Sequence, residues 1–430
     1  MKDIMAGIDL HSNNLMLGLV DSQGKRLYHK RLPCKLEDTA KALAPFRKRI
    51  HTIAVESTFN WYWLVDGLDE LGYKTVLANP AGIVQYAGIK DTDDKHDAFW
   101  LAEMLRLKIL PTGFICERTL RPVRDCLRRR LGLVHKRTAL ILSLKSLHAR
   151  MHGSALELGR IKRMGVDEVW RLFDNPSDQL VAREDQRLIQ ELSQSIERIE
   201  SHVLKRAQKM PEYKRLLTIP GIGRILGMTL ALETGDVKRF ASPGDYASYG
   251  RCVRSERRSN GKKKGENNSK CGNKYLSWAF VEAANFAQRY DPQAQSFYER
   301  KKAQTNIMVA TKSLACKLAK AAWHVMSKDV DYDSQRIFGG PQSPTSGQER
   351  CAPSQRKVSF SPGTAVENLN QKEKQAGEII TSPVEGSQLA GQAALGLRSR
   401  RALSSAGGGK RSQGGGAKPD KLNKNRPMKK

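Results

Sequence analysis

The chain has 430 residues, enough for two or three domains, and a formal net charge of +30 at pH 7 that favours a polyanionic partner such as nucleic acid. No apolar run approaches the length of a membrane-spanning helix, which is about 20 residues, and no signal peptide precedes the first predicted strand. We therefore expect a cytoplasmic protein without a membrane partner. Seven cysteines without a CxxC pair fit neither a disulfide framework nor a zinc site, and we interpret them as reduced.

The N-terminal part has the pattern of a sheet with helices. Residues 3–32 predict three antiparallel strands. Four further elements are predicted in chain order: a strand at 51–57, an amphipathic helix through 63–71, a strand at 74–79 and a helix at about 93–107. Three antiparallel strands followed by strand, helix, strand and helix is the order of an RNase H-like (RuvC-like) α/β domain. We assign it to residues 1–115.

The rest of the chain is predicted to be mainly helical. Apolar residues recur at spacings of three and four across residues 116–210, which indicates a helical hairpin or coiled coil. A dimer arm and two helices packed within one monomer explain this pattern equally well. Residues 211–332 form a third unit, mostly helical. Residues 333–430 are rich in Gly, Ser, Pro, Gln, Lys and Arg, so we expect a disordered basic tail.

Four carboxylates stand where an RNase H-like fold would bring them together. Asp9 ends the first strand in GIDLHSNN, and Glu56 ends the fourth in AVEST. Asp94 and Asp97 are three residues apart at a helix start in DDKHDA and share one face, although Asp93 could replace Asp94. Each acid alone could be a turn residue, a solvated strand end or a helix cap. In this order they predict a Mg²⁺ site for phosphoryl transfer to or from DNA.

Two stretches of the third unit are candidates for phosphate binding. Ile219 to Gly223 has the form of a helix-hairpin-helix turn, in which Gly221 and Gly223 would let the backbone bind a DNA phosphate. A tight turn without a ligand is the simpler explanation of so short a motif.

The second stretch, residues 251–276, is a basic run interrupted by glycine and asparagine, which predicts a flexible phosphate-binding loop. Its Ser255 and Ser259 could each attack a phosphate held by the neighbouring cations. The DNA- or RNA-binding candidates in it are Arg254, Arg257, Arg258, Lys262, Lys263 and Lys264.

Taken together, these motifs resemble the DEDD-type insertion-sequence transposases (insertion-sequence family one hundred and ten), which are bridge-RNA-guided recombinases. The resemblance covers roughly residues 3–332 and ends before the tail. It implies a RuvC-like domain, a coiled-coil insertion and a C-terminal transposase domain, assembled as dimers that pair into tetramers. It also implies Mg²⁺, a non-coding guide RNA and a place at the bacterial nucleoid. The implied catalytic residues are the metal-binding tetrad Asp9, Glu56, Asp94 and Asp97 and the nucleophile Ser259, which becomes attached to DNA.

Two other functions compete with a transposase. A nuclease resembling Holliday-junction resolvases would use the same four acids with water as nucleophile, but the basic run around Ser259 argues against it. A non-enzymatic nucleic-acid-binding protein would explain the charge and the tail but not the ordered acids. We therefore predict a DNA recombinase that cuts and rejoins strands.

Overall fold

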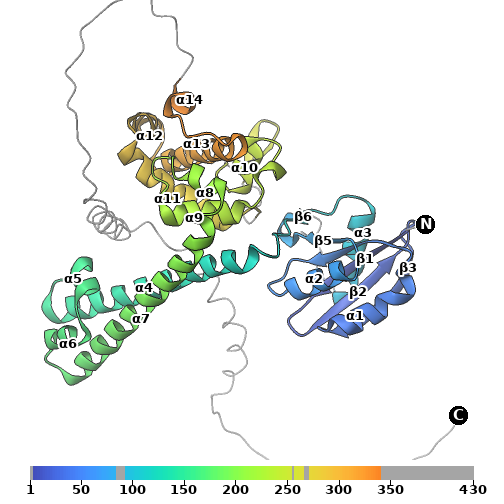
Figure 1. Ribbon diagram of the computed structural model, residues 1–430, viewed down its shortest axis with the longest axis horizontal. Coiled ribbons are helices and arrows are strands. Elements are labelled where there is room, and N and C mark those ends of the chain that lie inside the picture. The colour runs from blue at the N-terminus through green and yellow to red at the C-terminus, as the bar shows by residue number, and fades with distance from the viewer. Residues whose placement is uncertain (1–2, 84–92, 254–255, 266–270, 340–430) are drawn as a thin grey trace, which may run out of the picture. The chain divides into compact units, whose positions relative to one another are not determined.

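The computed structural model describes residues 3–83, 93–253, 256–265 and 271–339 (Figure 1). Arg254 and Ser255, both singled out above, lie outside these ranges. The described residues up to Leu156 and from Met164 to Gly339 belong to one compact unit, whereas Glu157–Arg163 does not.

A six-stranded mixed sheet with the order β3-β2-β1-β4-β5-β6 forms the N-terminal domain (Figure 1). Its strands are β1 (Ile4–Leu10), β2 (Asn14–Val20), β3 (Arg26–Pro33), β4 (Ile50–Glu56), β5 (Thr75–Ala78) and β6 (Thr112–Gly113). The first three strands are antiparallel, whereas β4 runs parallel to β1 and β5 parallel to β4. The predicted order of three antiparallel strands followed by strand, helix, strand and helix is therefore confirmed, with β6 and helix α1 (Leu36–Leu43) added to the predicted elements.

Helices cover both faces of the sheet. Helix α2 (Tyr62–Glu70) buries Leu64 and Leu68 in the same core as Ile8. Helix α3 (Asp94–Arg106) lies against β1 and β2 on the other face.

The contact with α3 depends on two glycines. A Cβ atom on Gly7 would stand 2.1 Å from the Ala98 carbonyl oxygen, and one on Gly18 would stand 3.1 Å from the Phe99 ring. Only glycine lets the helix backbone approach β1 this closely, and this approach brings the N-terminal turn of α3 to the end of β1.

Two helices of 32 residues each follow: α4 (Arg121–His152) and α7 (Pro176–Ala207). They pack along one another, bury Leu144 and Ile196 and carry an ion pair of 2.7 Å between Arg130 and Glu200. In the sequence, these two helices are separated by α5 (Leu158–Arg163), α6 (Val166–Val169) and a 3-10 turn, Trp170–Leu172. Pairing within one chain buries only part of the apolar pattern of this region, because Leu142, Leu180 and Leu188 remain exposed.

The C-terminal part is helical around a large apolar core. Its helices are α8 (Pro211–Leu216), α9 (Arg224–Thr234), α10 (Pro243–Tyr249), α11 (Lys274–Tyr290), α12 (Pro292–Gln304), α13 (Ile307–Lys328) and α14 (Ser334–Phe338), with a 3-10 turn at Val237–Arg239. Helix α9 is buried from Leu226 to Thr234, so the other helices pack around it.

The structure corrects two expectations for this part. The basic run contains a short β-hairpin of β7 (Arg257–Ser259) and β8 (Lys262–Gly265) instead of an irregular loop. Asn260 and Gly261 form its turn with φ values of +51° and +71°, the geometry for which an Asn-Gly pair is suited.

The second correction concerns the predicted tail. It begins with helix α14, in which the Ser334 hydroxyl donates to Asp291 and the Phe338 ring contacts Phe297. The overall composition of the tail did not suggest these contacts, although none of the residues of α14 is fully buried. Residues 340–430 lie outside the described part of the chain.

Two further observations concern expectations from composition. The six cysteines within the described ranges are free thiols, as expected. No helix in that part of the chain has the length and apolar character needed to cross a membrane.

Candidate active site in the N-terminal sheet

Asp9 and Glu56 meet at one edge of the sheet. They end the neighbouring parallel strands β1 and β4, in which Ile8 is opposite Val55. Asp9 is only 3% exposed, and Glu56 is half-buried. Burial, a hydrogen bond with Asp9 and the negative charges of Asp9 and Asp97 raise the pKa of Glu56 to about 8. The negative charge gathered at this place would be relieved by a bound cation.

The start of helix α3 supplies the other acids. Asp93 is the N-cap, and its carboxylate accepts a hydrogen bond of 2.7 Å from the His96 backbone N–H. Asp94 and Asp97 lie in the first turn of α3. Burial and the negative charge of Asp9 raise the pKa of Asp97, so this side chain belongs to the same group of acids. Asp93 is occupied as a helix cap, which leaves Asp94 as the second acid of this turn.

His11 is a member of this site that the sequence interpretation missed. Its Nε2 atom lies 3.1 Å from Asp9 Oδ2 and 3.4 Å from Asp94 Oδ1. The Asp94 carboxylate also accepts a hydrogen bond of 2.6 Å from Arg31 Nη2, which lies on strand β3. The spacing of Asp9 and His11 is a usable signal, because alternate residues of an extended chain point to the same side.

The group of acids has the donor set of a divalent cation site. Asp9, His11 and Asp94 each offer a ligand atom, and these atoms lie within 4.8 Å of one another. Within the described residues, the buried Asp97 Oδ1 atom has no hydrogen-bond partner. The buried Asp9 Oδ2 and His11 Nε2 atoms form no hydrogen bond there and lie 3.1 Å from each other. Buried polar atoms are almost always paired, so these atoms fit a cation that would complete them.

Ser259 lies in the C-terminal part of the chain. It ends strand β7, is exposed and pairs with Lys262 across the hairpin. Among the residues that the structure describes, no hydrogen bond joins it to the four acids. Lys262 and Lys264 are exposed beside it. For Arg257, Arg258 and Lys263 the structure describes the backbone in the two strands.

The turn between α8 and α9 has a packing role. Gly221 has φ +87°, and a Cβ atom there would stand 2.4 Å from the Ala283 carbonyl oxygen and 2.6 Å from the Ala287 nitrogen. Glycine at this position thus lets the turn lie directly on helix α11. Gly223 is the exposed N-cap of α9 with open space around its Cα. Of the two predicted phosphate contacts, Gly223 is the accessible one.

Comparison with known proteins gives two family matches in chain order. A family described as Transposase, of the DEDD type, matches residues 6–152, and the family described as Transposase IS116/IS110/IS902 matches residues 213–299. Together they cover more than half of the chain. The first spans the sheet, all four acids and α4, and the second spans α8 to α11 with the serine hairpin.

Two curated relatives agree with these matches. The transposase for insertion sequence element IS1328 of Yersinia enterocolitica is 26% identical over 345 residues, which are 75% of this chain and 97% of the relative. A candidate transposase of Sinorhizobium fredii, y4qE, is 25% identical over 239 residues, 54% of this chain and 57% of the relative. With its sheet, its group of acids and both family matches in order, the chain belongs to the IS116/IS110/IS902 family of DEDD transposases, enzymes that cut and rejoin DNA.

Proposed function

We propose that this transposase cuts DNA with Mg²⁺ held by Asp9, Glu56, Asp94 and Asp97 and with Ser259 as nucleophile. The observation that carries the proposal is the convergence of the acids from β1, β4 and α3, where the buried Asp97 Oδ1 atom has no hydrogen-bond partner among the described residues. The proposed domains are residues 1–115, 116–210 and 211–332, with α14 added to the last and the tail after it.

The chemistry assigns a separate task to each part. When bound, the cation would draw electron density from the scissile phosphate and stabilise its developing charge. The Ser259 oxygen attacks phosphorus, its proton passes to a neighbouring base or water, and one bridging P–O bond breaks with the electron pair leaving on the departing DNA oxygen. The serine–phosphate ester retains the energy of the broken phosphodiester, so a second DNA hydroxyl can reverse the step and rejoin the strands.

Several partners belong to the same proposal. The net charge of +30 favours a nucleic acid, and cations around the serine would hold the phosphate backbone. These are Arg254, Arg257, Arg258, Lys262, Lys263 and Lys264, with Gly221 and Gly223 at the α8–α9 turn. By its resemblance to bridge-RNA-guided recombinases, the chain would take its DNA target from a non-coding RNA, work at the bacterial nucleoid and pair as dimers into tetramers.

Denaturing gels with labelled DNA and Mg²⁺ test the serine. The wild-type chain should give a protease-sensitive covalent adduct, and Ser259→Ala should bind DNA without forming it. Free hydrolysed ends without an adduct would favour a resolvase-like nuclease that uses water. An adduct that persists in Ser259→Ala but disappears in Ser255→Ala would move the nucleophile to Ser255.

The acids are tested on helix α3, which offers a matched control. Asp97→Asn should reduce strand transfer by roughly 100-fold or more and leave DNA affinity nearly unchanged, since phosphate contacts do not need the cation. Asp93→Asn changes the charge of a neighbouring acid but keeps a good N-cap, so it should retain most activity. Wild-type strand transfer in Asp97→Asn would contradict the tetrad.

A further inference from the structure

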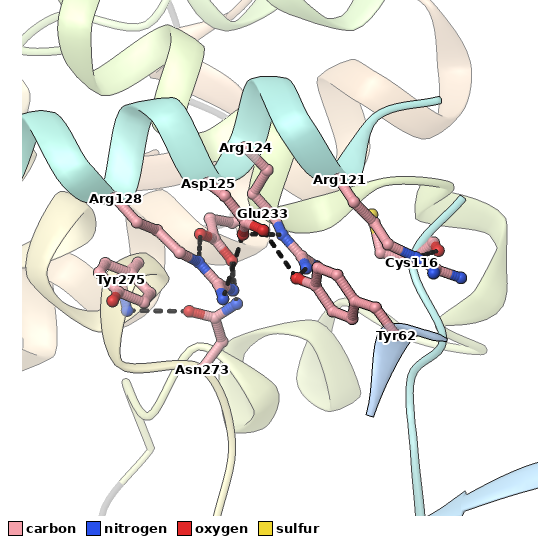
Figure 2. Close-up of polar contacts among 9 residues, drawn as sticks. All are labelled: Tyr62, Cys116, Arg121, Arg124, Asp125, Arg128, Glu233, Asn273 and Tyr275. Atoms are coloured by element: carbon pink, nitrogen blue, oxygen red, sulfur yellow. Dashed lines mark hydrogen bonds and ion pairs between the residues drawn. The ribbon is translucent and has the colours of Figure 1, made fainter. Parts of the chain in front are cut away.

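Three arginines form one face at the start of helix α4. Arg121, Arg124 and Arg128 follow at spacings of three and four and therefore lie on the same side of the helix. The first two are 5% and 7% exposed, which is unusual for guanidinium groups. Figure 2 shows this arginine face with several of its partners, among them Tyr62 and Glu233. Buried charges of this kind need specific partners, and the partners lie in two different parts of the chain.

One set of partners lies on helix α2 of the sheet domain. Arg121 Nη1 donates to Asp66 Oδ1 at 2.6 Å, and Arg124 Nη2 donates to the Tyr62 hydroxyl at 2.9 Å (Figure 2 shows the second pair). Helix α2 begins shortly after Glu56, the acid that ends β4. The start of α4 is thereby fixed to the element that follows the candidate metal site.

The other set of partners lies in the C-terminal core. Arg128 donates to both carboxylate oxygens of Glu233, at 2.6 and 2.7 Å, and Asn273 Nδ2 donates to Glu233 Oε2 at 2.7 Å (Figure 2). Glu233 is 3% exposed. Burial opposes the charge of Arg128, but the hydrogen bonds and charge of Glu233 outweigh burial and raise the pKa of Arg128. The carboxylate is thus fully paired, with a planar two-point contact that holds one orientation.

Asn273 also closes the base of the segment that contains Ser259. Its backbone N–H donates to the Tyr249 carbonyl at 2.6 Å, and Arg251 Nε donates to the Gly272 carbonyl at 3.1 Å. Gly272 has φ +88°, and a Cβ atom there would stand 2.4 Å from the Tyr249 oxygen. The chain therefore leaves the helical core after Tyr249 and returns to the same place at Gly272, with the serine hairpin between.

The geometry points to Asn273 as a positioning residue for Ser259: through Glu233 and Arg128, its side-chain amide fixes the base of the serine segment to helix α4. The same arginine face holds helix α2, so one helix carries both the serine segment and the domain with the four acids. This inference rests on the proposed role of Ser259. An ion pair between half-buried Arg128 and buried Glu233 contributes little net stability compared with apolar packing, so its value here lies in holding Asn273 against helix α4.

Asn273 also caps helix α11, and a suitable substitution can keep this cap. Its Oδ1 atom caps helix α11 by accepting from the Tyr275 and Leu276 backbone N–H groups. Serine is as good an N-cap, but it has no side-chain amide that could reach Glu233. Asn273→Ser therefore removes only the hydrogen bond to Glu233. The matched control is Asn306→Ser, because Asn306 caps helix α13 and contacts neither Glu233 nor Arg128 among the described residues.

The measurement is the rate of covalent adduct formation at saturating DNA, with DNA affinity and Tm determined in parallel. Asn273→Ser should slow the adduct by about 10- to 100-fold, the effect of misplacing a reacting group by about 1 Å, and leave affinity and Tm close to wild type. Asn306→Ser should leave the rate unchanged. A purely structural role of Asn273 would lower Tm and affinity together with the rate, and that result would overturn the inference.

A charge exchange gives an independent test. Asn273→Asp places a carboxylate against Glu233 and should also slow the adduct, whereas adding Glu233→Gln restores one amide and one carboxylate beside Arg128 and should recover most of the rate. If the double variant forms the adduct no faster than Asn273→Asp alone, the proposed role of the Asn273–Glu233 hydrogen bond is contradicted. A wild-type chain that forms no adduct overturns the serine role and this inference together, whereas a wild-type rate in Asn273→Ser overturns the inference alone.

Discussion

His11 Nε2 lies 3.1 Å from Asp9 Oδ2, although only Asp9 stands out in the sequence as a strand-end acid. The same nitrogen lies 3.4 Å from Asp94 Oδ1, so it stands between two of the candidate metal-binding carboxylates. A histidine in this place either completes the coordination of a cation or orients the carboxylate that does.

The first prediction follows from this contact. His11→Ala should weaken Mg²⁺ binding by about 10- to 100-fold, so that strand cutting is lost at low Mg²⁺ and recovers as the concentration rises. Titration of cutting against Mg²⁺ measures the shift. His202→Ala, an exposed histidine on helix α7, should follow the wild-type curve. An unchanged midpoint in His11→Ala would remove this side chain from the site.

The second prediction concerns the crowding of negative charge around Glu56. Once a chelator has removed divalent cations, Asp9, Glu56 and Asp97 repel one another, so Glu56→Gln should raise Tm above wild type at pH 8.5. Mg²⁺ should raise the Tm of the wild-type chain and have a much smaller effect on the variant, which should not cut DNA. Equal Tm values in chelator would mean that the carboxylates are not mutually destabilising.

The third prediction places the end of the folded part. A chain ending at Asp333 lacks the Ser334–Asp291 and Lys317–Ile337 hydrogen bonds and the Phe338–Phe297 contact, all of which a chain ending at Gly339 keeps. The shorter chain should therefore melt at least about 2 °C lower. Both chains lack residues 340–430, so the comparison isolates helix α14. Identical melting curves would show that α14 adds nothing to stability.

The fourth prediction is a pH dependence of stability from helix α11. Burial raises the pKa of Glu282 above the ordinary value of 4.5. The folded state therefore holds this proton more strongly than the unfolded state, and Glu282 costs stability once the pH exceeds 4.5. The cost grows until the pH passes the raised value.

Glu282→Gln should accordingly melt above wild type at pH 8, with the difference shrinking toward zero as the pH falls to about 4. Glu197→Gln, an exposed residue of α7, provides the control and should show little difference at either pH. A Tm difference independent of pH would mean that the substitution acts through packing instead of ionisation.

The sheet domain could be predicted from the sequence because its information is local. Alternating apolar residues mark the strands, and the rule that neighbouring parallel strands end together is enough to place Asp9 beside Glu56. The choice of Asp94 over Asp93 also followed from local spacing, and Asp93 proves to be the helix cap.

The remaining features depend on contacts between distant residues. No local sequence pattern around Glu233 or Arg128 predicts that these two residues pair, because they are more than a hundred positions apart. The sequence around Gly221 is equally consistent with a phosphate contact and with a packing position, and only the contact with α11 distinguishes the two. The β7–β8 hairpin is different, since the Asn260-Gly261 pair is a strong local turn signal that the high density of charge obscured.

That turn has a practical consequence for anyone purifying the protein. Asn260 and Gly261 are exposed, and an asparagine followed by glycine is the pair most prone to deamidation, in which the next backbone nitrogen displaces ammonia and water then opens the ring to aspartate or isoaspartate. The change would place a new negative charge directly after Ser259. Where isoaspartate forms, the main chain would also be one carbon atom longer at this position. Preparations stored warm or alkaline should lose activity while remaining folded, and peptide mapping of this segment would reveal the cause.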